Sequence, residues 1–276
     1  VERLGRGVVY FGSARLGEGS PYYERVVELA REVALLLRST CWTGGGPGMM
    51  RAASEGGLAA GCVAVGGIKI SREAGQDSVL VDDYLAPGAS MVCKHMPSRK
   101  AALMDAGIRL TEADRTAYVF LPGGLGTLDE LFALLTLIQL NKLGSRHPIP
   151  CLILNLDGFY DGLISLLAQF ESDGVLARAE LRTCMVANDC SAALNYLLDF
   201  YALVPRGACR SPGGLDGQDG PVLVTDDRSS HHSSVAHMPH VVSLSAVLAA
   251  SVAPSTGASV QSSKPGSAHG SVHNGL

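Results

Sequence analysis

The sequence predicts an α/β fold in which one domain is built on a doubly wound parallel sheet. Short apolar runs typical of buried parallel strands alternate along the chain with segments in which leucine and alanine recur at helical spacing. Three of the loops that follow apolar runs are rich in glycine. With 276 residues, 47% hydrophobic and 17% charged, the chain can bury one or two cores, which excludes a disulfide-stapled miniprotein. In such a sheet, ligands bind at the carboxyl ends of the strands.

Each expected strand is a short run of apolar, mostly β-branched or aromatic residues. These runs are Val8–Phe11, Thr40–Thr43, Cys62–Val65, Ala117–Leu121, Ile149–Leu154 and Thr183–Ala187. The expected helices lie between and after them, at Tyr22–Arg38, Pro47–Ala60, Met91–Leu110, Leu128–Leu143, Gly158–Ser172 and Ala192–Tyr201. Strand and helix alternate, so the connections are βαβ crossovers and the strands are expected to be parallel.

The composition changes near the end of the last expected helix. Every aromatic residue falls at or before Tyr201, and the segment beyond it is rich in serine, glycine and histidine. Such a segment lacks the large apolar groups that offset the entropy of ordering a chain. We therefore expect residues 1–203 to form the functional domain and residues 204–276 to form a low-complexity, disordered tail.

The charge distribution argues against two classes of partner. The net charge is −4, without a basic stripe, so a nucleic-acid binder is not expected. No run of about 18 apolar residues is present, so no membrane-spanning helix is expected. The chain begins at Val1 without a Met, and the sequence neither shows nor excludes a targeting segment before it.

The cysteines and histidines predict no metal or redox centre. Seven cysteines occur without a CxxC pair, and most lie in apolar, strand-like runs. Free thiols in such places behave as small hydrophobic groups and indicate a reducing compartment, so we expect a cytoplasmic protein. His95 and His147 have no partner at ligand spacing, and we expect no metal.

The three glycine-rich loops are candidate phosphate-binding turns. They contain Gly12-Ser13, Gly44–Met50 and Pro122–Thr127. Glycine lets the backbone approach an anion closely, and a following helix directs free N–H groups at it. None of these loops has the Walker or GxGxxG pattern, which argues against an ATPase or an ordinary dinucleotide dehydrogenase. The backbone positions expected at the ligand are Gly12, Ser13, Gly45, Gly46, Gly48 and Met49.

Two further patterns each allow two interpretations. Thr127-Leu128-Asp129-Glu130 has the T-x-x-E form of a helix capping box, but Glu130 could equally act as a general base or stabilise a cationic transition state. Arg99-Lys100 places two cations near the start of an expected helix, where they oppose the helix dipole. That pair indicates either a bound anion or a solvated basic surface.

Taken together, these motifs resemble the LONELY GUY family. The resemblance rests on Gly44-Gly45-Gly46-Pro47-Gly48-Met49-Met50, then Arg99-Lys100, then Pro122-Gly123-Gly124-Leu125-Gly126-Thr127-Leu128-Asp129-Glu130, and it extends through Asn155–Tyr160. It implies a Rossmann-like fold, a homodimer or larger assembly, no cofactor, and hydrolysis of cytokinin or adenine nucleoside 5′-monophosphates to free base and ribose 5-phosphate. It assigns Arg99 and Glu130 as catalytic residues. It further assigns nucleotide contacts to Lys100, Gly123, Gly124, Gly126, Thr127 and Thr136.

The sequence departs from the family pattern before the Arg-Lys pair. Many relatives carry a further acidic residue there, and Glu73 is its best match, although an exposed loop residue is an equal interpretation. The segment Met96-Pro97-Ser98 also differs, which leaves the choice of base open.

Two other functions remain open from the sequence. A non-catalytic carrier of a phosphorylated cofactor could use similar glycine turns but would not require the Arg99 and Glu130 pair. A pyridoxal-phosphate decarboxylase requires a lysine that forms a Schiff base. The nearest candidate, Lys100, stands beside Arg99 and suits phosphate contact better.

Overall fold

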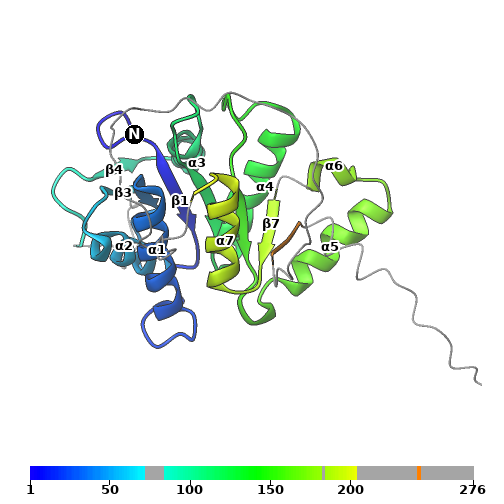
Figure 1. Cartoon of the computed structure of the whole chain (residues 1–276), viewed down its shortest axis with the longest axis horizontal. Helices are drawn as coiled ribbons and strands as arrows, with labels where there is room; N and C mark the ends of the chain where they lie inside the picture. Colours follow the sequence, from blue (N-terminus) through cyan, green and yellow to red (C-terminus); the bar gives the residue numbers. More distant parts are fainter. Residues whose placement is uncertain (72–83, 182–183, 204–240, 244–276) are drawn as a thin grey trace, which may run out of the picture.

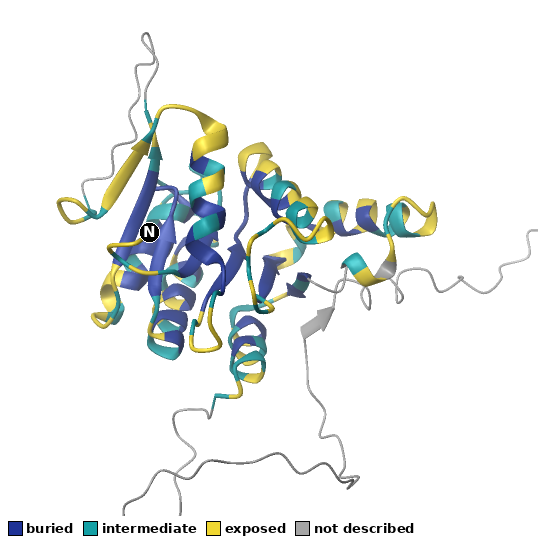
Figure 2. Ribbon diagram, turned by 90° about the horizontal axis from the view of Figure 1, so that it is seen from above, coloured by how far each residue is buried: buried dark blue, intermediate teal, exposed yellow. Residues whose placement is uncertain are grey.

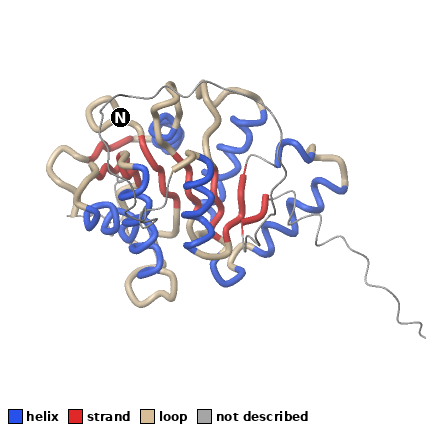
Figure 3. Tube along the Cα trace, in the orientation of Figure 1, coloured by secondary structure: helices blue, strands red, loops and turns tan. Residues whose placement is uncertain are grey.

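The computed structural model describes residues 1–71, 84–181, 184–203 and 241–243, and they form an α/β sandwich around one sheet (Figures 1 and 3). The strand order in the sheet is β4-β3-β2-β1-β5-β6-β7-β8. The strands are β1 (Gly7–Phe11), β2 (Thr40–Thr43), β3 (Val65–Ile70), β4 (Ser90–Cys93), β5 (Ala117–Phe120), β6 (Cys151–Leu154), β7 (Cys184–Ala187) and β8 (Val241–Ser243). All neighbouring strands pair in parallel except β7 and β8. The predicted doubly wound, Rossmann-like fold is confirmed.

Helices cover both faces of the sheet. One layer contains α1 (Tyr23–Leu37), α2 (Met49–Ala60) and α7 (Cys190–Phe200). The other layer contains α3 (Met96–Gly107), α4 (Leu125–Gln139) and α5 (Asp161–Ser172). A 3₁₀ turn, η1 (Leu156–Gly158), and the short helix α6 (Arg178–Leu181) complete the described elements.

The central strand β1 shows how the sheet separates two apolar cores. Successive side chains of a strand point to opposite faces. Val8 and Tyr10 accordingly pack with α1, α2 and α7, whereas Val9 and Phe11 pack with α3, α4 and α5. All of these side chains are almost completely buried, and Figure 2 shows the inner strands in the colour of buried residues.

The chain reverses its direction of winding between β1 and β5. From β1 the order runs outward through β2 and β3 on one side and through β5 and β6 on the other. The loops after β1 and β5 therefore part from each other at the carboxyl ends of their strands, which is where ligands bind in such sheets. Here the two loops are joined, because the N–H of Ser13 donates to the carbonyl of Pro122 at 3.1 Å.

Several predicted boundaries were wrong, and one short helix was not predicted. The third strand starts at Val65, and Cys62 lies exposed in the turn before it. The segment predicted as one helix from Met91 to Leu110 contains the edge strand β4 followed by α3, with a Pro in the first turn of α3. Helix α4 begins at Leu125, three residues before the predicted start, and α6 was not predicted.

Part of the predicted tail belongs to the sheet. Val241–Ser243 pair antiparallel with β7, from Val241 opposite Ala187 to Ser243 opposite Met185. Residues 204–240 and 244–276 lie outside the described residues, so the domain boundary near residue 203 stays a prediction. Within the described ranges, no helix has the length and apolar character needed to cross a bilayer.

Candidate functional site

A buried ion pair between α3 and α4 stands at the carboxyl edge of the sheet. Arg99 Nη1 donates to Glu130 Oε1 at 2.9 Å, and both residues are less than a tenth exposed. Arg99 Nε donates to the carbonyl of Ile68 in β3 at 2.9 Å. The guanidinium is therefore fixed by the sheet on one side and by the carboxylate on the other, so the two charges hold a defined geometry.

Burial determines the protonation of Glu130. Removal of water from the carboxyl group raises its pKa from 4.5 to about 7, although the positive charge and hydrogen bond of Arg99 act in the opposite direction. Asp129 raises this pKa further, and Lys100 lowers it. A carboxyl group with a pKa near neutrality can exchange a proton at physiological pH, which suits acid–base work.

The glycine loop after β2 is shaped around Arg99. A Cβ at Gly44 would lie 1.8 Å from Arg99 Nη2, so no larger residue fits there while the guanidinium keeps its place. Met50, at the start of α2, places its Sδ 3.9 Å from the same nitrogen. Gly44 and Met50 therefore belong to the surroundings of Arg99. Their place in the glycine-rich loop is the one sequence signal for this contact.

The glycines of the three loops allow their backbones to pack against one another. A Cβ at Gly48, where φ is +66°, would lie 2.3 Å from the carbonyl oxygen of Ser13. A Cβ at Gly12 would lie 2.6 Å from the Cβ of Met49. Gly45 donates its N–H to the Thr43 hydroxyl at 3.1 Å, so that N–H is already occupied. The loops after β1 and β2 therefore form one compact backbone surface.

Tyr84 connects a third segment to the loop after β2. Its hydroxyl donates to the carbonyl of Gly46 at 3.2 Å. Gly46 itself is partly exposed, as expected of a residue at the rim of the site.

The amino end of α4 presents unpaired backbone donors beside this surface. The helix starts after Gly124, so the N–H groups of Leu125, Gly126 and Thr127 have no acceptor within the helix. Nothing lies within 4 Å of a Cβ built at Gly124 or Gly126, which face open space. These groups and the positive end of the helix dipole favour an anion.

The capping-box interpretation of Thr127 and Glu130 was wrong. Gly124 is the N-cap of α4, and no side chain caps the helix. Thr127 is buried with its Oγ1 against the Cα of Gly123, where a Cβ would be only 2.2 Å away. Glu130 lies inside the helix, and its partner is Arg99 rather than a backbone N–H.

Lys100 points to the outside of the same region. Its Nζ lies 2.9 Å from Asp129 Oδ1, and about a quarter of its side chain is exposed. The pair crosses from α3 to α4 next to the Arg99 and Glu130 pair. Two cations and two carboxylates therefore alternate between these helices, one pair buried and one at the surface.

Two predicted site residues do not join this cluster, and a third is not described. Met49 is fully buried in the core beneath the glycine loops, and its N–H donates to the carbonyl of Ser13 at 2.8 Å. Thr136 is exposed on α4 and donates to the carbonyl of Phe132 at 2.7 Å. Glu73 lies outside the described residues.

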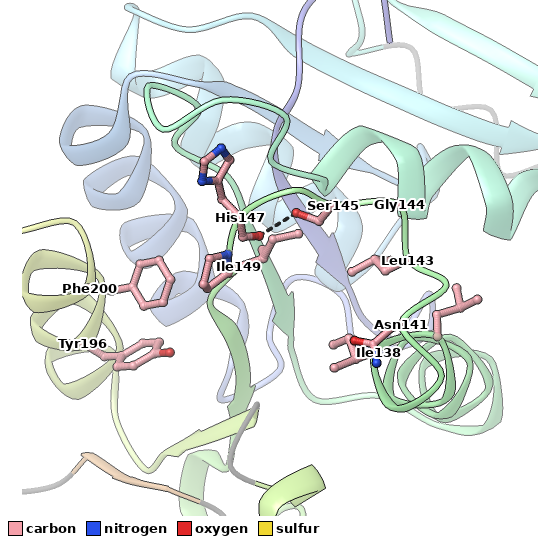
Figure 4. A pocket seen from close by; sticks show the side chains of 11 residues that line it. Ile138, Asn141, Leu143, Gly144, Ser145, His147, Ile149, Tyr196 and Phe200 are labelled. Atoms are coloured by element: carbon pink, nitrogen blue, oxygen red, sulfur yellow. Dashed lines mark hydrogen bonds between the residues drawn. The ribbon is translucent and has the colours of Figure 1, made fainter.

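A separate pocket of about 380 Å³ opens at the opposite edge of the sheet (Figure 4). It lies between the carboxyl ends of α4 and α7 and the start of β6, and its lining includes Ile138, His147, Tyr196 and Phe200. None of the predicted site residues lines it. In the part of the chain that the structure describes, no three His, Cys, Asp or Glu side chains gather as metal ligands.

The chain is similar in sequence to known proteins. The sequence model of the family described as "Possible lysine decarboxylase" matches residues 50–197. The cytokinin riboside 5′-monophosphate phosphoribohydrolase LOG of Oryza sativa subsp. japonica is 31% identical over 188 residues, covering 67% of this chain and 69% of that protein. LOG4 of Arabidopsis thaliana, with the same activity in its name, is 29% identical over 178 residues, covering 63% and 73%.

Among solved structures, the molybdenum cofactor carrier protein from Chlamydomonas reinhardtii is similar, with a TM-score of 0.48 and 16% identity over 72% of this chain and 99% of that one.

The family assignment rests on the sequence comparisons. The family model covers more than half of this chain, and the rice relative exceeds 30% identity over two thirds of it. The chain therefore belongs to the LONELY GUY (LOG) family, to which the decarboxylase description has been attached.

Proposed function

We propose that the protein hydrolyses the N-glycosidic bond of a nucleoside 5′-monophosphate of the adenine or cytokinin type, with release of the free base and ribose 5-phosphate. The observation that carries the proposal is the buried pair of Arg99 and Glu130 beside the open amino end of α4. The family relatives support this chemistry, since their names specify cytokinin riboside 5′-monophosphates.

Glu130 is suited to the charge that develops in this reaction. Cleavage of the bond between C1′ and the base nitrogen builds positive charge on the ribose ring. A carboxylate fixed by Arg99 can stabilise that charge and orient the water that adds to C1′, while the base leaves with a proton on its ring nitrogen. Because Glu130 is buried, its carboxylate acts more strongly there than it would in solvent.

The 5′-phosphate is assigned to the amino end of α4. Gly124, Gly126 and Thr127 contribute backbone N–H groups, and the neighbouring glycine turns allow a phosphate to approach. Lys100 adds a positive charge nearby, although Asp129 shares it. We expect removal of the 5′-phosphate to reduce turnover far more than a change of base.

The decarboxylase alternative has less support. A Schiff base requires a neutral lysine amine, but Lys100 Nζ forms an ion pair with Asp129 at 2.9 Å. The decarboxylase hypothesis would be supported by an aldimine absorbance band that forms on addition of pyridoxal phosphate and is absent from Lys100→Ala.

The outer face of α4 supports assembly into a homodimer or larger oligomer. Leu125, Phe132 and Leu140 expose 87%, 37% and 59% of their surfaces there. Thr136 lies one helical turn from both Phe132 and Leu140, on the same face. Exposed apolar surface of this kind commonly marks a protein interface. Light scattering coupled to size-exclusion chromatography measures the oligomeric state directly.

A substrate panel with matched variants tests the proposed reaction. The panel holds adenosine monophosphate, its isopentenyl derivative, other nucleoside monophosphates and the unphosphorylated nucleosides, and chromatography follows base release. We expect release only from monophosphates, and its loss in Glu130→Gln with nucleotide binding retained. Glu24→Gln makes the same change at an exposed position of α1 and serves as the control.

The outcomes separate the candidate functions. Hydrolysis retained by Glu130→Gln contradicts the mechanism. Nucleotide binding without base release from the unmutated protein indicates the carrier instead.

A further inference from the structure

The segment between β6 and α5 forms a tight turn at the carboxyl edge of the sheet, near the loops of the site. It runs through the 3₁₀ turn η1 (Leu156–Gly158), and Asp157 and Gly158 both have positive φ, at 54° and 75°. A Cβ at Gly158 would lie 2.7 Å from Asp161 Oδ2, so glycine is required for the turn to close. The turn therefore has a fixed shape that the sequence Asn-Leu-Asp-Gly-Phe-Tyr-Asp specifies.

Asn155 attaches this turn to the sheet. Its backbone N–H donates to the carbonyl of Ala187 at the end of β7, at 2.9 Å. Its side-chain amide donates to Asp161 Oδ1 at 2.8 Å, and its Oδ1 accepts the N–H of Tyr160 at 2.7 Å. One buried side chain thus fixes the position from which Tyr160 leaves the turn.

The phenol of Tyr160 reaches the loop after β5. Its hydroxyl donates to the carbonyl of Leu121 at 2.6 Å. Burial raises the pKa of Tyr160, and the backbone of Gly123 beside the hydroxyl lowers it by less. Tyr160 is 4% exposed, and its ring lies 4.9 Å from that of Phe159 between centroids. The hydroxyl is therefore bonded to the residue before Pro122 and lies near the residue after it.

These contacts leave a defined set of donors for a ligand. The Leu121 carbonyl accepts from the Tyr160 hydroxyl, and the Pro122 carbonyl accepts from Ser13. The loop is therefore held on two sides, and its next residues enter α4 with N–H groups that have no acceptor within the helix. Without the Tyr160 hydroxyl, the Leu121 carbonyl loses a buried hydrogen-bond partner, and the turn is free to relax.

We propose that Tyr160 is a positioning residue, whose hydroxyl fixes the Pro122–Gly124 turn so that the amino end of α4 can bind the phosphate of a phosphorylated sugar or nucleotide. The proposal rests on the proposed function for the identity of the ligand. Tyr160 does not touch the ligand; it acts through the backbone of the turn. The segment Asn155–Asp161 then has a role in binding.

The other end of β5 provides a matched control. Tyr201 also binds the backbone there: its hydroxyl donates to the carbonyl of Thr116, and the N–H of Thr116 donates back at 3.0 Å. Thr116 directly precedes β5, at the edge of the sheet opposite the site. Tyr160→Phe and Tyr201→Phe therefore each remove a buried hydroxyl that binds the backbone at one end of the same strand.

The experiment measures ligand binding, turnover and stability of the full chain for both variants. Calorimetry gives the Kd of ribose 5-phosphate, kinetics give KM and kcat for adenosine monophosphate, and thermal unfolding gives Tm. We expect Tyr160→Phe to raise Kd and KM about tenfold, equivalent to about 1.4 kcal/mol, with kcat changed less than about twofold, as for a lost ground-state contact. Tyr201→Phe should lower Tm by a similar few degrees but leave Kd within about twofold.

Two results overturn the proposal: an unchanged Kd for ribose 5-phosphate in Tyr160→Phe, or an equal rise in Kd in both variants, which makes the effect one of general stability. If the unmutated protein releases no base, the proposed hydrolysis fails, yet the Kd comparison still decides the role of Tyr160. A change in Kd confined to Tyr160→Phe supports the positioning role in either case.

Discussion

Replacement of Glu130 by glutamine should change how the stability of the protein depends on pH. Glu130 is buried, and its pKa rises from 4.5 to about 7 because burial destabilises the carboxylate more than Arg99 stabilises it. Below pH 4.5 the group is protonated in both the folded and unfolded protein. Between pH 4.5 and about 7 the unfolded chain ionises first, so the folded state loses stability as the pH rises through this range.

The amount of stability lost follows from the size of the pKa shift of Glu130. A pKa that moves from 4.5 to about 7 corresponds to about 3 kcal/mol, which is fully lost by about pH 8. That is a large part of the 5–15 kcal/mol by which a domain of this kind is stable. Glutamine keeps the shape of the side chain and can still accept a hydrogen bond from Arg99, but it cannot ionise. Any constant cost of the substitution is independent of pH.

Urea unfolding at several pH values between 4.5 and 8.5 measures the effect. The free energy of unfolding of the unmutated protein, minus that of Glu130→Gln, should fall by about 3 kcal/mol across the range. Glu24→Gln, exposed on α1, should give a difference that stays flat. In the active enzyme, kcat/KM should rise with pH through the same midpoint near 7, because the proposed mechanism needs the carboxylate.

The reasoning is refuted if the difference between the unmutated protein and Glu130→Gln stays constant with pH. A difference that rises with pH also refutes it, because that sign requires a lowered pKa, in which Arg99 outweighs burial. The stability difference could fall by the expected amount while kcat/KM shows no midpoint near pH 7. In that case Glu130 has the raised pKa, but its carboxylate takes no part in the rate-determining step.

Three further results are expected. Gly44→Ala should reduce kcat/KM at least about 100-fold, because the new Cβ displaces Arg99 Nη2. Circular dichroism should show that the fold is retained. Normal activity of this variant contradicts the conclusion that the guanidinium has a fixed position. Arg109→Ala should lower the free energy of unfolding by about 3 kcal/mol in urea titrations, since the buried Arg109 guanidinium donates to three backbone carbonyls. Truncation after Val204 should preserve hydrolysis and leave Tm nearly unchanged, because the described residues that it removes are the three edge residues that pair with β7; insoluble or inactive protein makes the tail structural.

The sheet could be predicted because its inner strands are short, buried and mostly apolar. The edge strand β4 could not, since three of its four residues are exposed and Met91 and Val92 continue the apolar pattern of the helix that follows. Pro97, in the first turn of α3, was the available signal, because proline is favoured where a helix begins and not within it. The apolar pattern alone did not separate β4 from α3, whereas Pro97 marks the boundary between them.

Arg99 and Glu130 were singled out as a pair by resemblance and not by spacing. Thr127 and Glu130 satisfy a local capping rule, yet the helix starts before them and Glu130 pairs with Arg99, 31 residues away in the sequence. Spacing within one segment carries no information about the distance between two helices. Met49 fails for a related reason: it belongs to a glycine-rich motif, but its side chain falls on the face of α2 that packs on the sheet.

Helix α4 connects two regions that a small molecule could reach. Glu130 lies near its start, and Leu137 and Ile138, about 10 Å further along at 1.5 Å per residue, line the pocket at the far edge of the sheet. A compound seated in that pocket leaves the substrate entrance open. Helix α4 is the element common to both regions, so a compound that shifts its carboxyl end there also shifts the helix that carries Glu130.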